Sequence, residues 1–435
     1  MLNQIASKLI PGYLLGEVSL VRIFGICLSL TLKNTMQQQS IPINPSVLQW
    51  ARLEAGLSLH EAASRAKITP PRKKKDEPVL TAEDRLAAWE EGKDTPSLSQ
   101  LEKIASAYRR PLLTFFLAQP PQKVASMADF RAVWDKLSPT DSPEFAALRR
   151  RISLLHQELR ALAEDARNPK LPFIGSLSES TPVQQFVGTL RAALGASVEE
   201  QRRIRSEDAM FGYLRDLAQN IGVYVLLEGN VGSHHSNIPA EEFRGIALAD
   251  ELVPLVVVNP NDAKAAMVFT LVHELAHLWL GSSGVSNFNA LGNNGGDGDH
   301  EKLCNSVAAE FLVPAADLLV KWKKPQGELS CSVDVVARYF KVSGAVIGRR
   351  LLDMNLIDSQ EYGSLLAFYK ARWVKHKEKQ SQQEGAPGPT QMAKYRLGGK
   401  TIHTFVIAAR EGRIGLQDAA RLMNLPVNRF EQVMR

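Results

Sequence analysis

The sequence predicts a multidomain, mainly α-helical chain with one small β-sheet, and three observations lead to this fold class. The chain has 435 residues, of which 45% are hydrophobic and 23% charged, so it can form two to four domains of ordinary globular composition. Apolar residues recur at helical spacing along much of the chain. Short β-branched and apolar runs, typical of buried strands, occur at residues 222–227 and 253–258.

The first 35 residues form a poorly defined extension. The segment from Tyr13 to Leu32 is apolar, but Glu17 and Arg22 interrupt it. Its charge-free part is about half of the ~20 residues that a membrane-spanning helix needs. We therefore expect no membrane span, and we favour translation from Met36 over the alternative of a signal peptide.

Residues 44–118 are predicted to form a bundle of short helices. Ser58 is placed to cap the second of them. Short helices joined by short connections are typical of a helix-turn-helix bundle. The predicted helices span residues 45–55, 59–66, 82–91 and 97–108.

Further helices are predicted through the rest of the chain. A long charged helix follows Ser142, its expected N-cap, with Pro143 at the first position. Residues 282–298 are rich in Gly, Asn and Ser and predict an exposed loop. The predicted helical segments span residues 143–167, 182–222, 263–280, 300–319, 333–355 and 412–434, and the last two each resemble a helix, a tight turn and another helix.

These segments divide the chain into seven predicted regions. They are the N-terminal extension (1–35), a helix-turn-helix domain (44–118), a helical connecting region (119–221), a core that holds the sheet (222–325), a segment like a helix-turn-helix (326–374), a flexible linker (375–394) and a C-terminal helical segment (395–435). The linker is predicted because this segment is charged and rich in Pro, Gly and Gln.

The net charge and the cysteine content indicate the cellular compartment in which the protein is expected. The chain has 52 Lys and Arg residues and 46 Asp and Glu residues, so its net charge is 52 − 46 = +6. This charge is compatible with nucleic-acid contact but is equally common among cytosolic enzymes. Cys27, Cys304 and Cys331 form no CxxC pair, so a disulfide framework is not expected. We therefore predict a cytoplasmic protein.

The stretch His273-Glu274-Leu275-Ala276-His277 predicts a zinc site. On a helix, residues four apart project from one face, so His273 and His277 can bind one ion. Glu274 falls beside the metal, where it can take a proton from bound water. The alternative is a buried helix whose two His are only hydrogen-bonded. The apolar residues around the motif favour the metal, because buried polar groups are costly unless they are used.

A catalytic zinc ion needs a third protein ligand and one open position. The next helix offers Glu301, Cys304 and Glu310, and His300 precedes it. We favour Glu301, because Asn305 lies four residues later on the same helical face and can support the ligands by hydrogen bonding. Glu310 can instead be a structural partner, and Cys304 would give a His-His-Cys site that suits deaminases better than proteases.

The motif and its surroundings resemble the ImmA/IrrE family of metallo-endopeptidases. The likeness covers about residues 245–314 and includes the strand that ends at Asn259, the helix at 268–277 and the segment 301–314. It implies a zincin-like protease core, zinc bound by His273, His277 and Glu301, and Glu274 as the catalytic residue. The sequence departs from the family at Cys304, Val307 and Val313, where the family has Ala, Phe and Met; all are apolar or small replacements.

The mechanism implied is metal-assisted peptide hydrolysis. Glu274 would take a proton from water and pass it to the leaving amine. The group that stabilises the oxyanion is not singled out; the candidates are His234, His235 and His300.

Residues 44–117 resemble the Xre/Cro-type helix-turn-helix domains that are fused to this protease family. The likeness lies in Trp50-Ala51-Arg52, Ala55-Gly56-Leu57-Ser58 and Trp89-Glu90-Glu91-Gly92. It implies DNA contact by basic side chains, for which the candidates are Arg72, Lys73, Lys74, Lys75 and Arg85.

Two departures weaken the inference of DNA binding. An insertion at 69–80 lengthens the link to the expected recognition helix. That helix carries Glu83, Asp84, Glu90 and Glu91, and carboxylates repel phosphate. A protein-recognition module or a purely structural module is the alternative.

Three functions are therefore open. The first is a zinc endopeptidase that cleaves a regulatory protein of the repressor type and is located by its N-terminal module on DNA or on its target. The second is a non-enzymatic transcription regulator whose zinc fold senses a signal. The third is an antitoxin or partner-binding protein of similar architecture. The presence of Glu274 favours the enzyme, since a sensor has no need of a proton-transfer residue.

Overall fold

A computed structural model of the chain describes residues 43–70, 80–108, 110, 112–120, 142–232, 236–286, 299–324, 327–380 and 388–434. The predictions for the N-terminal extension, for Arg72 to Lys75, and for His234 and His235 lie outside these residues. The chain divides into two compact units, one within residues 1–124 and one within residues 125–435.

The first unit is a small helical bundle. Ser58 caps its second helix as predicted, in a reciprocal capping box with Glu61. Its core includes Leu48, Trp89 and Phe115. Its elements are α3 (Pro45–Glu54), α4 (Leu59–Arg65), α5 (Ala82–Glu90), α6 (Leu98–Ala107) and the 3-10 helix η1 (Leu112–Phe116).

The carboxylates of α5 are largely engaged within the unit. Glu90 is buried and accepts hydrogen bonds from Arg52, with Nε to Oε1 at 2.8 Å. Asp84 accepts from the backbone N–H of Thr81 at 2.7 Å and so caps the helix. Of the four carboxylates noted in this region, Glu90 is therefore buried inside the unit rather than exposed. The pattern of charges along the sequence did not show that Glu90 has a buried ionic partner.

The second unit is built on a four-stranded sheet in the order β1-β3-β2-β4. Strand β1 runs parallel to β3, and β2 runs antiparallel to both β3 and β4. The sequence predicted β1 and β3 only. The strands are β1 (Tyr224–Leu227), β2 (Gly245–Leu248), β3 (Leu255–Val258) and β4 (Gly284–Ser286).

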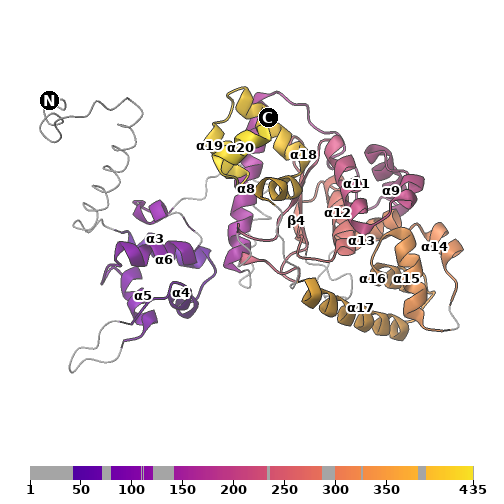
Figure 1. The fold of residues 1–435 in the computed structure, drawn as a ribbon, viewed down its shortest axis with the longest axis horizontal. Helices are drawn as coiled ribbons and strands as arrows, with labels where there is room; N and C mark the ends of the chain where they lie inside the picture. The colour runs from indigo at the N-terminus through magenta and orange to yellow at the C-terminus, as the bar shows by residue number, and fades with distance from the viewer. Residues whose placement is uncertain are drawn as a thin grey trace, which may run out of the picture. The chain divides into compact units, whose positions relative to one another are not determined.

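Helices cover both faces of this sheet (Figure 1). Helix α8 (Pro143–Asp165), capped by Ser142 as predicted, packs on one face with α18 (Pro389–Arg410), α19 (Leu416–Leu422) and α20 (Val427–Met434). The other face is covered by helices of the middle of the chain. They are α9 (Val183–Leu194), α11 (Glu207–Asn220), α12 (Lys264–Trp279), α13 (Asp299–Leu312), α15 (Leu329–Phe340) and α16 (Gly344–Asp353).

Three predicted segments differ in detail. The helical region 182–222 contains three helices, α9, α10 (Val198–Arg203) and α11. The segment 300–319 divides at Pro314, which caps α14 (Ala315–Lys321) because proline cannot continue a helix. The predicted linker 375–394 is helical at both ends. Helix α17 (Ser359–Gln380) reaches into it and α18 begins within it, since Lys, Glu and Gln are good helix formers.

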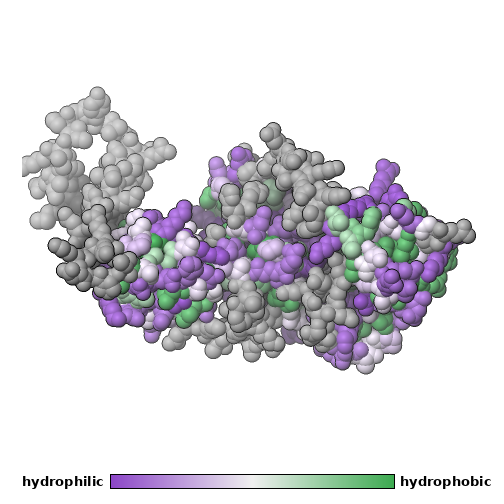
Figure 2. Space-filling view, turned by 90° about the horizontal axis from the view of Figure 1, so that it is seen from below, coloured by the Kyte–Doolittle hydropathy of each residue, from purple (hydrophilic) through white to green (hydrophobic). Residues whose placement is uncertain are grey.

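In the part of the chain that the structure describes, no single helix is long and apolar enough to cross a membrane. Helices α13 and α14 reach the length and apolar content of a membrane span only when they are taken together, and the two helices are bent by 51° relative to each other. The apolar residues of α13 are buried in the core of the second unit. On the face shown in Figure 2, hydrophobic side chains lie in patches between hydrophilic ones.

Candidate metal centre

A fixed turn places the helix that carries the His pair. Asn259, directly after β3, is fully buried and donates two hydrogen bonds, to the carbonyl oxygens of Ile238 at 3.1 Å and Phe243 at 3.0 Å. Its side-chain oxygen accepts from the N–H of Asn261 at 3.0 Å. Asp262 then accepts from the N–H of Ala263, the residue before α12. The end of β3 therefore sets where α12 begins.

The two His of α12 point to one place. His273 and His277 are 0% and 3% exposed, and their Nε2 atoms are 3.0 Å apart. Their spacing of four residues puts them on one face of the helix, as predicted. Two imidazole nitrogens this close need a proton or a cation between them.

Glu301 of α13 completes the group. Its Oε2 lies 3.2 Å from His273 Nε2 and its Oε1 lies 3.2 Å from His277 Nε2. Donor atoms of all three residues lie within 4.8 Å of one another. Tetrahedral zinc with bonds of about 2.0–2.1 Å keeps its donor atoms about 3.3 Å apart. The three residues therefore fit a zinc ion, and they leave the fourth position of the tetrahedron to another ligand.

The other candidate ligands have different roles. Glu310 pairs with Arg350 of α16 and accepts from the N–H of Ala315 at 3.3 Å, so it joins helices. His300 pairs with Glu179. Cys304 is buried and hydrogen-bonds the ring of His277, so its thiol lies directly beside the metal group.

The protonation states of two members suit metal binding. Burial lowers the pKa of His273 to about 4, which keeps its ring neutral. Burial acts to raise the pKa of Glu301, but hydrogen bonds with both imidazoles outweigh it and hold this pKa well below its usual range. For His277, burial opposes the charge, yet hydrogen bonds with Cys304 and Glu301 raise its pKa well above 6.5. A metal ion binding at His277 would therefore displace a proton.

A second layer of polar groups orients the ligands. Asn305 acts to raise the pKa of His273, against the larger effect of burial, and its role in supporting the ligands stays a prediction. Ser282 Oγ lies 2.9 Å from His277 Nδ1. The sequence does not point to Ser282, because it begins a stretch whose composition predicts an exposed loop. Its position five residues after a His ligand was the available signal.

Glu274 lies between α12 and the sheet. Its side chain is 0% exposed. Within the described residues, neither of its carboxylate oxygens has a hydrogen-bond partner at normal distance and angle. Burial raises the pKa of Glu274 to about 8, while His277 and the hydroxyl of Ser286 act in the opposite direction. Ser286 Oγ also lies 3.4 Å from His273 Nε2. A buried carboxyl group without firm partners is costly, which is typical of a functional position.

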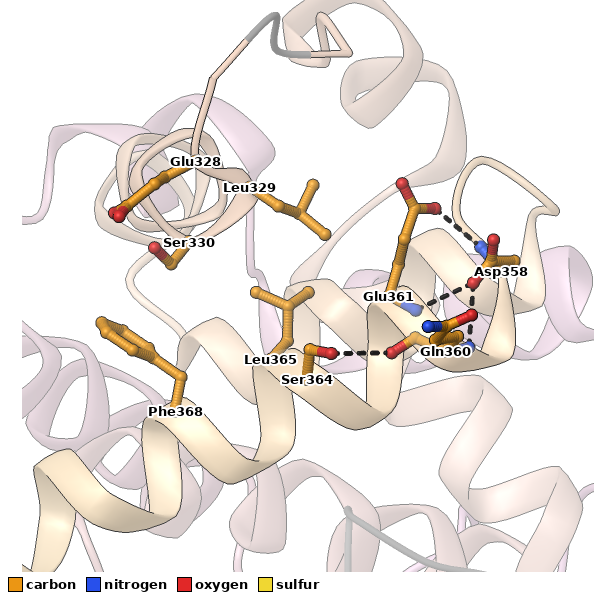
Figure 3. A pocket seen from close by; sticks show the side chains of 9 residues that line it. All are labelled: Glu328, Leu329, Ser330, Asp358, Gln360, Glu361, Ser364, Leu365 and Phe368. Atoms are coloured by element: carbon orange, nitrogen blue, oxygen red, sulfur yellow. Dashed lines mark hydrogen bonds between the residues drawn. The ribbon is translucent and has the colours of Figure 1, made fainter.

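A pocket of about 390 Å³ lies apart from these residues, between the start of α15 and α17 (Figure 3). It contains none of the metal group or Glu274. Its acidic side chains are used locally: Glu361 accepts from the N–H of Asp358 at 3.0 Å and pairs with Lys324 at 3.2 Å.

The DNA-contact candidate Arg85 is engaged inside the first unit. It donates to the carbonyl oxygen of Thr69 at 3.0 Å, and its guanidinium lies 5.2 Å from the centre of the Trp89 ring. Its role towards DNA stays a prediction.

A helix with two His, a carboxylate from the next helix and a buried Glu beside them form a group that could hold a metal ion, as in metallopeptidase domains. Residues 219–352 match the family model of the IrrE N-terminal-like domain, a peptidase family. This match supports the ImmA/IrrE resemblance for the stretch from β1 to α16 and includes His273, Glu274, His277 and Glu301. No curated protein and no solved structure matches the chain.

Proposed function

We propose that the protein is a zinc-dependent endopeptidase. One observation carries this proposal: His273, His277 and Glu301 converge within 4.8 Å while the buried Glu274 lies beside them. The match of residues 219–352 to a peptidase family supports it.

The residues divide the chemistry between them. His273, His277 and Glu301 would hold the ion. The chemistry that zinc would supply there is the acidification of a bound water and the polarisation of a peptide carbonyl. Glu274 takes the proton of the attacking water on a carboxylate oxygen and gives it to the leaving amine. Burial raises the pKa of the Glu274 carboxyl group, which favours its holding a transferred proton until the amine leaves.

Three substitutions test the assignment, with zinc content and cleavage of candidate repressor-type proteins as readouts. Glu274→Gln should retain zinc and lose about 10²-fold or more of the cleavage rate. Glu301→Gln should lose zinc. Glu310→Gln is the matched control on the same helix and should retain zinc, because Glu310 pairs with Arg350.

If Glu274→Gln cleaves as fast as the wild type, the protease proposal fails. Zinc binding without any cleavage would support the alternative, a transcription regulator that uses the zinc fold as a sensor.

We further propose that the substrate is a regulatory protein of the repressor type, met in the cytoplasm, and that the first unit locates the enzyme on DNA or on this substrate. The resemblance of residues 44–117 to Xre/Cro-type domains supports this, as does the run Arg72-Lys73-Lys74-Lys75. The engagement of Glu90 with Arg52 removes one of the charges that would repel phosphate.

A mobility-shift assay with the full chain tests the DNA proposal. The wild type should shift duplex DNA at low salt, and changing all four residues 72–75 to Ser should weaken binding and flatten its salt dependence. Absence of a shift at low salt would leave only the role in protein recognition.

A further inference from the structure

Strand β2 passes directly beside the carboxylate of Glu274, and the residue at that point is Gly245. We propose that Gly245 is a positioning residue: its missing side chain forms the notch in the sheet that holds Glu274 in its catalytic place. This inference rests on the proposed function, since it assigns Glu274 a reaction to serve.

The space at Gly245 is filled by Glu274 itself. A Cβ atom built on Gly245 would lie 2.2 Å from Glu274 Oε1, 2.6 Å from Cδ and 2.7 Å from Cγ. Contacts below 3.0 Å are essentially never seen for real Cβ atoms. Any other residue at 245 is therefore incompatible with the observed conformation of Glu274.

The backbone of β2 cannot easily move away to relieve such a contact. Gly245 pairs with Val258 of β3 on one side and with Ser286 of β4 on the other. At the preceding residue, the N–H of Arg244 donates to the carbonyl oxygen of Ser286 at 3.0 Å. The carbonyl oxygen of Arg244 accepts from the N–H of Asn259 at 2.9 Å. The strand is held on both sides, so a new methyl group would displace the Glu274 side chain.

Displacing the Glu274 side chain would impair catalysis but leave the three metal ligands in place. The ligands come from α12 and α13, and no ligand atom is among the close neighbours of Gly245. A general base must lie within hydrogen-bond reach of the proton it takes. Misplacement by about 1 Å can cost about 10²-fold in rate.

The same sheet offers a matched control. Gly284 of β4 is also a strand glycine, but a Cβ built on it has no neighbouring atom within 4 Å. Gly284→Ala therefore adds the same methyl group without a contact and separates the effect of the notch from the general effect of alanine in a strand.

The experiment measures the full chain in three ways: zinc content, cleavage rate and the urea midpoint of unfolding. Gly245→Ala and Gly284→Ala are each made in the wild type and in a Glu274→Ala background. We expect Gly245→Ala to retain zinc, to lose about 10²-fold of the cleavage rate and to lower the midpoint. In the Glu274→Ala background its effect on the midpoint should shrink to that of Gly284→Ala, because the contact is gone.

An equal change of the midpoint by Gly245→Ala in both backgrounds would overturn the inference, as would a cleavage rate within twofold of the wild type. If the wild type itself cleaves none of the candidate substrates, the proposed function fails. The midpoints would then still decide whether Gly245 and Glu274 are coupled.

Discussion

Glu301 and Glu310 lie on the same helix but serve different neighbours. Nine residues correspond to about 900° of rotation on an α-helix, which is two and a half turns. The two carboxylates therefore project from opposite faces of α13. Glu301 faces the His pair of α12, and Glu310 faces Arg350 of α16. The helical period thus separates a metal-binding carboxylate from a structural one.

Ser282 should contribute to zinc affinity without touching the metal. Its hydroxyl lies 2.9 Å from His277 Nδ1 and fixes which ring nitrogen is free for the ion. Ser282→Ala is expected to weaken zinc binding about tenfold to 100-fold in a chelator competition. Ser306→Ala, which removes only a hydrogen bond to the backbone of its own helix, is the control. Equal zinc affinity in both variants would contradict this role.

At this scale the sequence predicts only the local part of the site. His273, Glu274 and His277 could be chosen because helical spacing alone puts them together. Glu301 needed the packing of α12 on α13 and was chosen from its neighbour Asn305. Gly245 and Ser286 could not be found, since Gly245 reaches Glu274 only through the packing of β2 on α12, and Ser286 is placed there by the pairing of β4 with β2. Both depend on contacts between residues far apart in the chain.

At the scale of elements, helix α8 is rich in charged residues, yet one of its faces is buried against the sheet. Its apolar residues Leu148, Ile152 and Leu159 lie in the core against the sheet. On the same side, His156 hydrogen-bonds the carbonyl oxygen of Val253 at 3.0 Å, and Asp250 Oδ2 lies 3.7 Å from its Nε2. The helix and its cap were predicted. Its place on the sheet was not, because a period of 3.6 shows that one face is buried but not what covers it.

His156 should make stability fall in mild acid. Burial lowers its pKa below the ordinary 6.5, so the folded protein keeps the ring neutral while the unfolded chain takes up a proton. Stability from this group is full above pH 6.5 and is lost as the pH falls below it. His156→Gln is expected to flatten the dependence of unfolding free energy on pH between pH 7.5 and 5.5, measured by urea titration. A slope equal to that of the wild type would exclude this role.

Strands were harder to predict than helices. The runs at β1 and β3 are apolar and β-branched because both faces of these strands are buried. Strand β2 is Gly-Ile-Ala-Leu, and β4 is Gly-Val-Ser within a stretch rich in Gly and Ser. Their extended form comes from pairing with neighbours rather than from the preference of their own residues.

Across the whole second unit, one sheet joins segments that are distant in the chain. Glu228, just after β1, pairs with Arg151 of α8 and with Arg396 of α18, the latter at 3.0 Å. Arg215 of α11 donates to the carbonyl oxygens of Tyr395 and Arg396. These contacts end the first part of α18 near Gly398, whose φ of 75° breaks the helical geometry. The C-terminal helices are thus tied to both the sheet and α11.

The variant Phe405→Ala can show whether the second unit unfolds in a single cooperative step. Phe405 is 0% exposed in the core formed by α8, the sheet and α18 to α20. Phe405→Ala is expected to cost about 3–5 kcal/mol, and zinc release and loss of helix on heating should shift together. Leu416→Ala, at a residue 40% exposed on α19, should have little effect. Zinc release that stays at the wild-type temperature would show that the C-terminal helices unfold separately.

The covering of the sheet by α18 to α20 also sets an order of events during synthesis. About 160 residues separate β1 from the start of α18. At about 5–20 residues per second, the part of this face that α8 does not cover stays exposed for roughly 8–32 s of synthesis. The metal group faces the helices made earlier, but the sheet beneath it is complete on both sides only at the end. We therefore expect the nascent chain to expose apolar surface that chaperones can bind during this interval.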